Sequence, residues 1–290
     1  MLGGHPRPAV RPSHRTEELY LVDSHCHLDF APEGEREAIV ARARRAGVAT
    51  LVTICTKLAE FPLVRAIAET DPDIWCSVGT HPHEAAAEKG AAAEELSNLT
   101  RHPKVIGIGE TGLDFHYNHS PRADQETAFR THARAARAAG LPLIVHSRDA
   151  DAETVSILAE EKPPAGVIHC FSTGRLLAER ALELGFYISL SGIVTFKTAG
   201  ELRAITRDIP LDRLLVETDA PYLAPMPLRG KTNEPAFLVH TAAFIAGLKG
   251  VSPQELAERT SANFFRLFAK ARPPDFASRP ATPSRASGGG

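Results

Sequence analysis

Cysteine is scarce in this chain, and no two cysteines stand in a CxxC pair. The sequence has 4 cysteines among 290 residues, all in or beside apolar runs that predict strands: Cys26, Cys55, Cys76 and Cys170. This usage argues against both a disulfide framework and a cysteine zinc site, and it favours buried thiols. Cys26 and Cys170 each adjoin a candidate metal ligand, but strand alternation should turn both thiols away from it, so we expect both to be packing residues.

Long apolar runs are also missing. No run approaches the roughly 18 to 20 residues that are needed to span a bilayer. The Arg-rich and Pro-rich start of the chain has no apolar core of the kind that a signal peptide carries. We therefore expect a cytoplasmic protein that has no membrane partner.

An excess of charge of one sign is absent too, since the formal net charge is −2. Residues 1–17 and 271–290 each contain three arginines and one acidic residue, so the part between them is more acidic than the whole chain. An acidic body is a poor match for duplex nucleic acid that is wrapped through many phosphates. Any contact with nucleic acid should therefore be local.

The composition of the two ends differs from that of the middle. Residues 1–17 and 271–290 are rich in Pro, Arg, Ser, Ala and Gly, and we expect disordered tails there, on either side of one folded domain at 18–270. Within that domain, short apolar runs alternate with longer stretches of helical spacing, as in βα units. The expected strands are residues 20–24, 50–55, 74–79, 104–109, 141–146, 166–170, 186–191 and 214–218. The expected helices include residues 36–46, 121–139, 175–184, 234–248 and 253–269, and Gly47, Gly140 and Gly185 stand where helix C-caps belong.

Eight βα units in one continuous domain predict an α/β fold, the (β/α)8 TIM barrel. The alternative is a doubly wound sheet, which would need a Gly-rich phosphate loop after its first strand. This chain has no such loop there. The barrel is therefore the expected fold.

Metal-binding side chains follow several of the apolar runs, and in a parallel barrel such positions meet at one mouth. Six donors are too many for one tetrahedral zinc ion but suit two cations that share a carboxylate. The pattern predicts two divalent cations (Mg²⁺, Mn²⁺ or Zn²⁺), an activated water and a hydrolytic reaction. The candidate donors are His25, His27, Glu110, His146, His169 and Asp219.

Each donor taken alone is a weak signal. His25 and His27 are two residues apart, so an extended segment projects both to the same side. A single histidine after an apolar run, such as His146 or His169, is more often a hydrogen-bonded core residue, and Glu110 alone could be an ion-paired or capping residue. Their placement at the same end of the barrel favours the metal site. Asp23 is expected to orient one of the histidine rings without binding the metal itself.

Two acidic residues close the eighth expected strand. Asp219 is expected to complete the shell of one metal and to accept a proton from the bridging water, which makes it the catalytic general base. Glu217 either tunes the site or fills a buried polar layer, and the second interpretation is favoured.

Other side chains on this face are candidates for binding the substrate. His81 follows the third expected strand and is assigned to a phosphate or leaving group, while His83 is expected to be a loop residue. Arg148 and Lys197 follow the fifth and seventh strands and are candidate anion contacts, with a salt bridge within the loops as the equal alternative for both.

These motifs resemble those of the TatD-family metal-dependent deoxyribonucleases, within the amidohydrolase superfamily. The resemblance covers roughly residues 20–270 and includes every proposed donor; the small departure at Thr173 and Gly174 should not touch the metals. The matching blocks are DSHCHLD at 23–29, GTHP at 79–82, GETGLD at 109–114, HSRDA at 146–150, HCFS at 169–172, ETDAPYL at 217–223 and RGKTNEP at 229–235.

The resemblance implies a division of the donors. His25 and His27 would hold one metal with Asp219, His146 and His169 would hold the other, and Glu110 would bridge the two. It also implies phosphodiester hydrolysis, with DNA ends or single strands as the substrate.

Other functions stay open at this point. The same metal-activated water could attack a carboxylic ester or amide, including an aminoacyl ester on tRNA. A lactonase or phosphotriesterase is less favoured because many such sites bridge their metals with a modified lysine. A barrel that has lost catalysis and only binds a partner is disfavoured, because all six donors are present.

Overall fold

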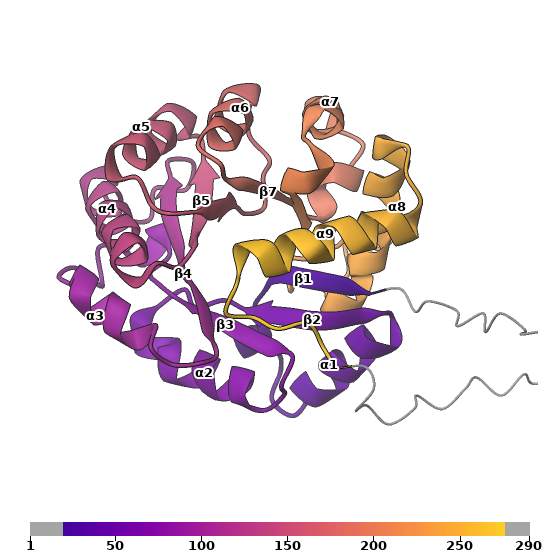
Figure 1. Cartoon of the computed structure of the whole chain (residues 1–290), viewed down its shortest axis with the longest axis horizontal. Coiled ribbons are helices and arrows are strands. Elements are labelled where there is room, and N and C mark those ends of the chain that lie inside the picture. Colours follow the sequence, from indigo (N-terminus) through magenta and orange to yellow (C-terminus); the bar gives the residue numbers. More distant parts are fainter. Residues whose placement is uncertain (1–19, 276–290) are drawn as a thin grey trace, which may run out of the picture.

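Eight parallel strands alternate with helices through residues 20–275, which are the residues that the computed structural model describes (Figure 1). The strands follow one another around the sheet in chain order. The predicted (β/α)8 barrel is confirmed. The predicted tail at 1–17 and most of the one at 271–290 lie outside the described residues. The strands are β1 Leu21–Cys26, β2 Val48–Thr53, β3 Ile74–Val78, β4 Val105–Asp114, β5 Leu143–Arg148, β6 Gly166–Ile168, β7 Tyr187–Leu190 and β8 Leu214–Val216.

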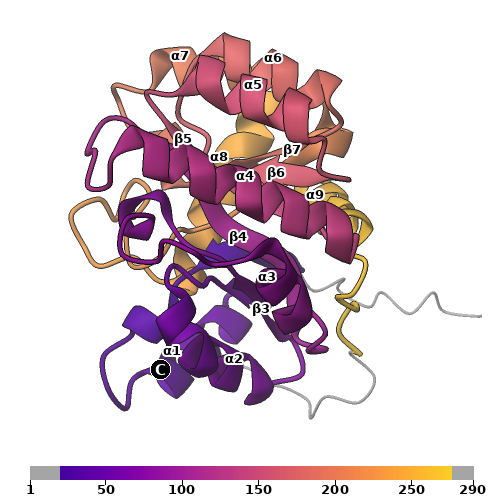
Figure 2. The ribbon, with the colours of Figure 1, turned by 90° about the vertical axis from the view of Figure 1, so that its left-hand side faces the viewer.

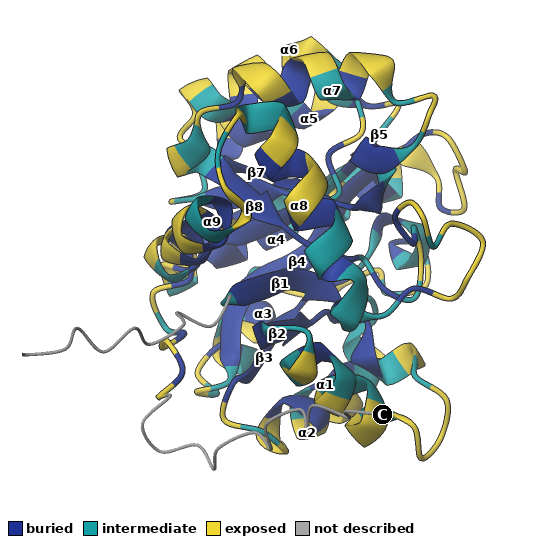
Figure 3. Ribbon diagram, turned by 90° about the vertical axis from the view of Figure 1, so that its right-hand side faces the viewer, coloured by how far each residue is buried: buried dark blue, intermediate teal, exposed yellow. Residues whose placement is uncertain are grey.

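Helices cover the outside of the barrel, and apolar side chains pack between them and the strands. In Figure 2, α4 lies across the strands with α5 on one side and α3 on the other. Figure 3 shows buried strands inside and helices whose outer faces are exposed. The helices are α1 Arg36–Arg45, α2 Phe61–Glu69, α3 Ala93–Leu99, α4 Arg122–Ala139, α5 Asp151–Glu161, α6 Arg175–Glu183, α7 Gly200–Asp208, α8 Leu238–Lys249 and α9 Pro253–Leu267.

The inside of the barrel is filled by a separate apolar layer, to which each strand contributes. Phe264 and Phe268, at the end of α9, pack against this layer and are both fully buried. They make α9 a cover over the end of the barrel opposite the strand C-termini. The inward side chains, one for each strand in order, are Val22, Val52, Trp75, Ile106, Ile144, Val167, Tyr187 and Leu215.

The first and last strands meet at their carboxyl ends. The backbone N–H of Asp219 donates to the carbonyl of His25 over 2.9 Å, and the N–H of His27 donates to the carbonyl of Ala220 over 2.8 Å. These hydrogen bonds bring two segments that are far apart in the sequence into one seam. The seam places the β1 histidines beside Asp219.

The fourth strand is longer than predicted. Glu110 was expected to follow its last residue, but β4 continues to Asp114 and shifts its register against β5 between Ile108 and Thr111. Gly109 has a φ of 134°, a conformation that favours glycine, and a Cβ there would collide with the carbonyl of Ile144. Because of this irregularity, one strand supplies both Glu110 and Asp114 to the mouth.

Within residues 20–275 no single helix is long and apolar enough to cross a membrane; the adjoining segments Pro235–Lys249 and Pro253–Leu267 reach the required length and composition only as a pair bent by 104°.

Candidate metal centre

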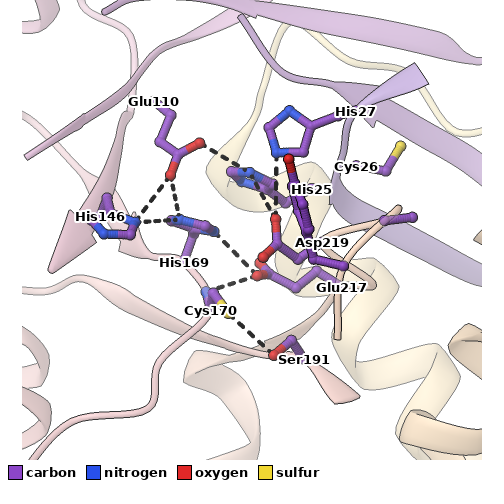
Figure 4. A network of polar contacts seen from close by, with 12 residues as sticks. His25, Cys26, His27, Glu110, His146, His169, Cys170, Ser191, Glu217 and Asp219 are labelled. Carbon is purple, nitrogen blue, oxygen red and sulfur yellow. Dashed lines mark hydrogen bonds and ion pairs between the residues drawn. The ribbon is translucent and has the colours of Figure 1, made fainter. Parts of the chain in front are cut away.

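Glu110 contacts three of the other five predicted donors, His25, His146 and His169 (Figure 4). Its Oε1 atom is 2.7 Å from His169 Nε2 and 3.1 Å from His146 Nδ1. Its Oε2 atom is 3.3 Å from His25 Nε2. The two oxygens of one carboxylate therefore face imidazoles that come from different strands. The bridging role of Glu110 stays a prediction.

Asp219 joins the donors of the first strand. Its Oδ1 atom is 3.4 Å from His27 Nε2 and 3.7 Å from His25 Nε2. The positive φ of Asp219, 55°, lets the chain turn sharply after β8 at this point. The structure thus brings all six predicted donors into one neighbourhood.

Buried ring nitrogens in this cluster need a partner. Neither nitrogen of His25 makes a hydrogen bond to any described residue, and the same is true of His27 Nδ1, although these atoms are shielded from solvent. Leaving buried polar atoms unpaired is costly, and a cation is the partner that two imidazoles beside two carboxylates would accept. The residues present therefore fit a metal centre.

The charges of the cluster are strongly coupled. Burial would raise the pKa of Glu110, but the imidazoles of His169, His81 and His25 outweigh it and hold that pKa well below its usual range. Burial lowers the pKa of His25, and the neighbouring His169 lowers it further. A neutral imidazole next to an ionised carboxylate is the combination that metal binding requires.

His169 carries a proton that a cation could replace. Burial opposes its charged form, yet Glu110 and Glu217 raise the pKa of His169 well above its ordinary value. For Asp219 the balance runs the other way: burial raises its pKa, and the hydrogen bond with His27 and the charges of His25 and His169 lower it below the ordinary value. Asp219 is therefore ionised at neutral pH.

Glu217 is a buried polar residue, as favoured from the sequence, and it also contacts one of the donors directly. Its Oε1 atom accepts hydrogen bonds from His169 Nδ1 over 3.2 Å and from the backbone N–H of Cys170 over 2.7 Å. Glu217 is fully buried, and β8 ends just before it, so its side chain reaches across to the end of β6.

Asp23 also supports the site, but not through a histidine ring as predicted. Its Oδ1 atom accepts from the backbone N–H groups of Thr218 and His25, and its Oδ2 atom accepts from the Thr218 hydroxyl. Burial raises the pKa of Asp23 to about 8, even though these hydrogen bonds lower it. Asp23 thus fixes the backbones on both sides of the seam.

His81 and His83 extend the cluster beyond the six donors. His81 Nε2 is 3.3 Å from Glu110 Oε1, and His81, Glu110 and His146 offer ligand atoms within 4.8 Å of one another. The role of His81 in binding substrate stays a prediction. His83 is not a simple loop residue: its Nε2 atom lies 2.9 Å from Asp114 Oδ2, which also lies 3.3 Å from His146 Nε2.

Asp114 is a site residue that reasoning from sequence spacing missed. It holds His83 and His146 together and accepts further hydrogen bonds from the backbones of His116 and Tyr117. Burial would raise the pKa of Asp114, but its hydrogen bonds hold the pKa below the ordinary value. Its position at the end of the GLD run was the only signal in the sequence.

The centre lies at the floor of a cavity of about 550 Å³. Arg148 lines this cavity and stacks its guanidinium on Tyr117, 4.7 Å from the ring centroid, rather than forming the salt bridge that was the alternative. Lys197 is exposed and is not among the residues that line the cavity. Of the two predicted anion contacts, the structure places only Arg148 beside the centre.

The thiols divide into two kinds. Cys26, Cys55 and Cys76 are fully buried, as predicted. The prediction that the Cys170 thiol turns away from the site is wrong, because Cys170 lines the cavity and its Sγ atom lies 3.2 Å from Ser191 Oγ. Strand alternation failed there because β6 ends at Ile168 and Cys170 has a φ of 43°, which turns it inward.

Comparison with known proteins decides the family. The family model described as "TatD related DNase" matches residues 22–269. The chain belongs to the TatD family. It is therefore a metal-dependent hydrolase, and the resemblance found in its motifs is confirmed.

Several TatD relatives cover most of the chain. It is 43% identical over 256 residues to an "uncharacterized metal-dependent hydrolase YcfH" of Escherichia coli K12, which covers 86% of this chain and 96% of that protein. It is 38% identical over 241 residues to a "3'-5' ssDNA/RNA exonuclease TatD" of Klebsiella pneumoniae, covering 81% and 92%. The crystal structure of YjjV, a TatD homologue from Escherichia coli K12, superposes with a TM-score of 0.81 at 31% identity, covering 86% and 98%.

Proposed function

We propose that this hydrolase cleaves phosphodiester bonds of DNA, at ends or in single strands, with two divalent cations in its centre. One observation carries the proposal: both oxygens of Glu110 face imidazoles, Oε2 toward His25 and Oε1 toward His146 and His169. A carboxylate in this position can bridge two cations. The relative that is named as an exonuclease of single-stranded DNA and RNA supports nucleic acid as the substrate.

The division of the donors between the two cations follows the family resemblance. His25 and His27, with Asp219, would hold one cation, and His146 and His169 would hold the other. Imidazoles suit Zn²⁺ or Mn²⁺, and the carboxylates also permit Mg²⁺. When bound, such cations lower the pKa of a water molecule and neutralise the charge on a phosphate.

Asp219 is the proposed general base. Both carboxylates line the cavity, but the Asp219 side chain is 14% exposed, against 3% for Glu110, so it is the more open of the two. Because its pKa is lowered, it is ionised at neutral pH and can accept the proton of the attacking water. His81 and Arg148 line the same cavity as proposed phosphate contacts, and the exposed Lys197 would meet only a longer substrate.

The test compares substrates and one pair of variants. Protein free of contaminating nuclease is loaded with Mg²⁺, Mn²⁺ or Zn²⁺ and assayed on single-stranded DNA, on an aminoacyl ester of tRNA and on a small carboxylic ester. Asp219→Asn should remove most DNA hydrolysis, whereas Asp212→Asn, an exposed acid before β8, should not. Normal DNA hydrolysis by Asp219→Asn, or faster turnover of an ester than of DNA, would overturn the proposal.

A further inference from the structure

Large aromatic side chains are exposed around the mouth of the cavity, where burial would normally be expected. Phe30 is 42% exposed, and Tyr117 and Tyr222 are each 53% exposed. All three line the cavity that holds the metal centre. Flat apolar surface left open beside a reactive centre indicates a ligand with flat faces.

The first aromatic pair consists of Phe30, just after β1, and Tyr222, just after β8. The Phe30 ring is stacked on the His27 ring, with centroids 5.0 Å apart and planes at 14°. Tyr222 meets Phe30 edge-on at 6.4 Å. This pair therefore continues outward from the donors of the first proposed cation.

The second aromatic group consists of Tyr117 and His119, in the loop between β4 and α4. Their rings are stacked with centroids 5.7 Å apart and planes at 10°. Arg148, at the end of β5, covers the Tyr117 ring with its guanidinium. This group lies next to His83, whose ring centroid is 5.7 Å from that of Tyr117, and so next to the donors of the second proposed cation.

The strand order sets the two groups on opposite sides. In a barrel whose strands run in order from β1 to β8, the β8 and β1 seam lies across from β4 and β5. The donors lie between the two groups. A phosphodiester held by both cations would thus have one aromatic group on each side.

Nucleobases fit such surfaces. Bases stack on exposed aromatic rings and on arginine planes without regard to sequence, and they do so only when they are not stacked in a duplex. An arginine beside one of the rings can also pair with a neighbouring phosphate. A carboxylic ester without flat groups would leave both aromatic groups unused.

We infer that the first aromatic pair and the second aromatic group each bind one unpaired nucleobase, one on either side of the scissile phosphodiester, with Arg148 at the next phosphate. The inference rests on the proposed function for its substrate class. It adds that the substrate must be single-stranded on both sides of the bond that is cut.

The experiment combines protein variants that lack one aromatic side chain with DNA strands that lack one base. Binding of a short fluorescein-labelled oligothymidylate is followed by fluorescence anisotropy with metal-loaded Asp219→Asn protein, which slows turnover. Tyr117→Ala and Tyr222→Ala are each introduced, and a single abasic residue is moved along the strand. Each variant should weaken binding of the intact strand roughly 5- to 100-fold, the effect of losing one base stack. When the strand already lacks the base that stacks on Tyr222, Tyr222→Ala should bind it as tightly as the parent protein does. Tyr117→Ala should match the parent protein only when a different base is missing.

The matched control is Phe244→Ala on α8, which removes another aromatic that is 36% exposed and does not line the cavity. It should leave binding unchanged. No binding by the parent protein, or losses that are the same at every abasic position, would overturn the inference. If the protein cleaves DNA but the variants show no dependence on the abasic position, the inference alone is rejected. If the variants show that dependence but the wild-type protein does not cleave DNA, the proposed nuclease activity alone is rejected.

Discussion

Glu217 holds His169 at one ring nitrogen while Glu110 faces the other. The distances are 3.2 Å from Glu217 Oε1 to His169 Nδ1 and 2.7 Å from Glu110 Oε1 to His169 Nε2. The first hydrogen bond fixes the tautomer that leaves Nε2 for a cation. The same Glu217 oxygen accepts from the backbone of Cys170, so the ring and the chain beside it are oriented together.

Replacing Glu217 should weaken metal binding without removing a donor. We expect Glu217→Ala to lower metal affinity about 10- to 100-fold, and Glu217→Gln to lower it less because the amide oxygen still accepts a hydrogen bond. Isothermal titration with Zn²⁺ measures both. Glu183→Ala, at an exposed residue of α6, is the control. Wild-type affinity in Glu217→Ala would show that the hydrogen bond does not support the centre.

Removing the metal should abolish hydrolysis and leave the fold in place. The two apolar layers of the barrel contain none of the six donors, so the apoprotein should keep its far-ultraviolet circular dichroism. Adding metal at 100 times its Kd should stabilise the native state by about 2.7 kcal/mol, seen as a higher Tm. A Tm that does not respond to Mg²⁺, Mn²⁺ or Zn²⁺ would count against a metal centre.

His132 should make stability depend on pH in the acid range. It is buried in α4, accepts at Nε2 from the backbone N–H of Thr80 and donates from Nδ1 to the carbonyl of Ala128. Burial lowers the pKa of His132 to about 4. Unfolding returns that pKa to about 6.5, so the unfolded chain binds the proton first and stability falls as the pH drops from about 6.5 toward 4.

The matching variant is His132→Gln, which cannot take up a proton. Between pH 7 and pH 5 the wild-type protein should lose about 2 kcal/mol more free energy of unfolding than this variant does. Urea denaturation at both pH values measures the difference. Equal losses in the two proteins would mean that His132 is not kept neutral in the fold.

The cover formed by α9 should contribute strongly to stability. Phe264 is fully buried against the inner layer of the barrel, so we expect Phe264→Ala to lower the free energy of unfolding by about 3 to 5 kcal/mol. Phe265→Ala, at the half-buried neighbour, should cost less. Urea denaturation compares the two, and equal losses would argue against α9 as the inner cover.

Much of the fold was predictable because the physical signal is local. Apolar runs of five or six residues alternate with helical spacing, and all eight expected strands exist. The exception is β4, where the left-handed Gly109 lets the strand shift its register and continue past Glu110. A change of register depends on the neighbouring strand, and the spacing along one strand does not reveal it.

The grouping of the six candidate donors was predictable from the sequence, but the contacts that support them were not. The six donors follow apolar runs, which is a pattern visible in the sequence. Asp114, His83 and Glu217 contact residues that follow other strands, and Cys170 faces inward because of one backbone angle. Such relationships exist only in three dimensions, so a linear pattern can suggest the residue type but not the contact.

The contacts between β1 and β8 also determine when the donor set becomes complete during synthesis on the ribosome. A growing chain that has emerged only as far as β7 already carries every donor except Asp219, yet the partner that His25 and His27 need has not been made. The hydrogen bond from the Asp219 amide to the His25 carbonyl can form only when the final strand arrives. A nascent chain that ends before Asp219 therefore lacks one of the six donors, and the donor set is complete only after β8 has been made.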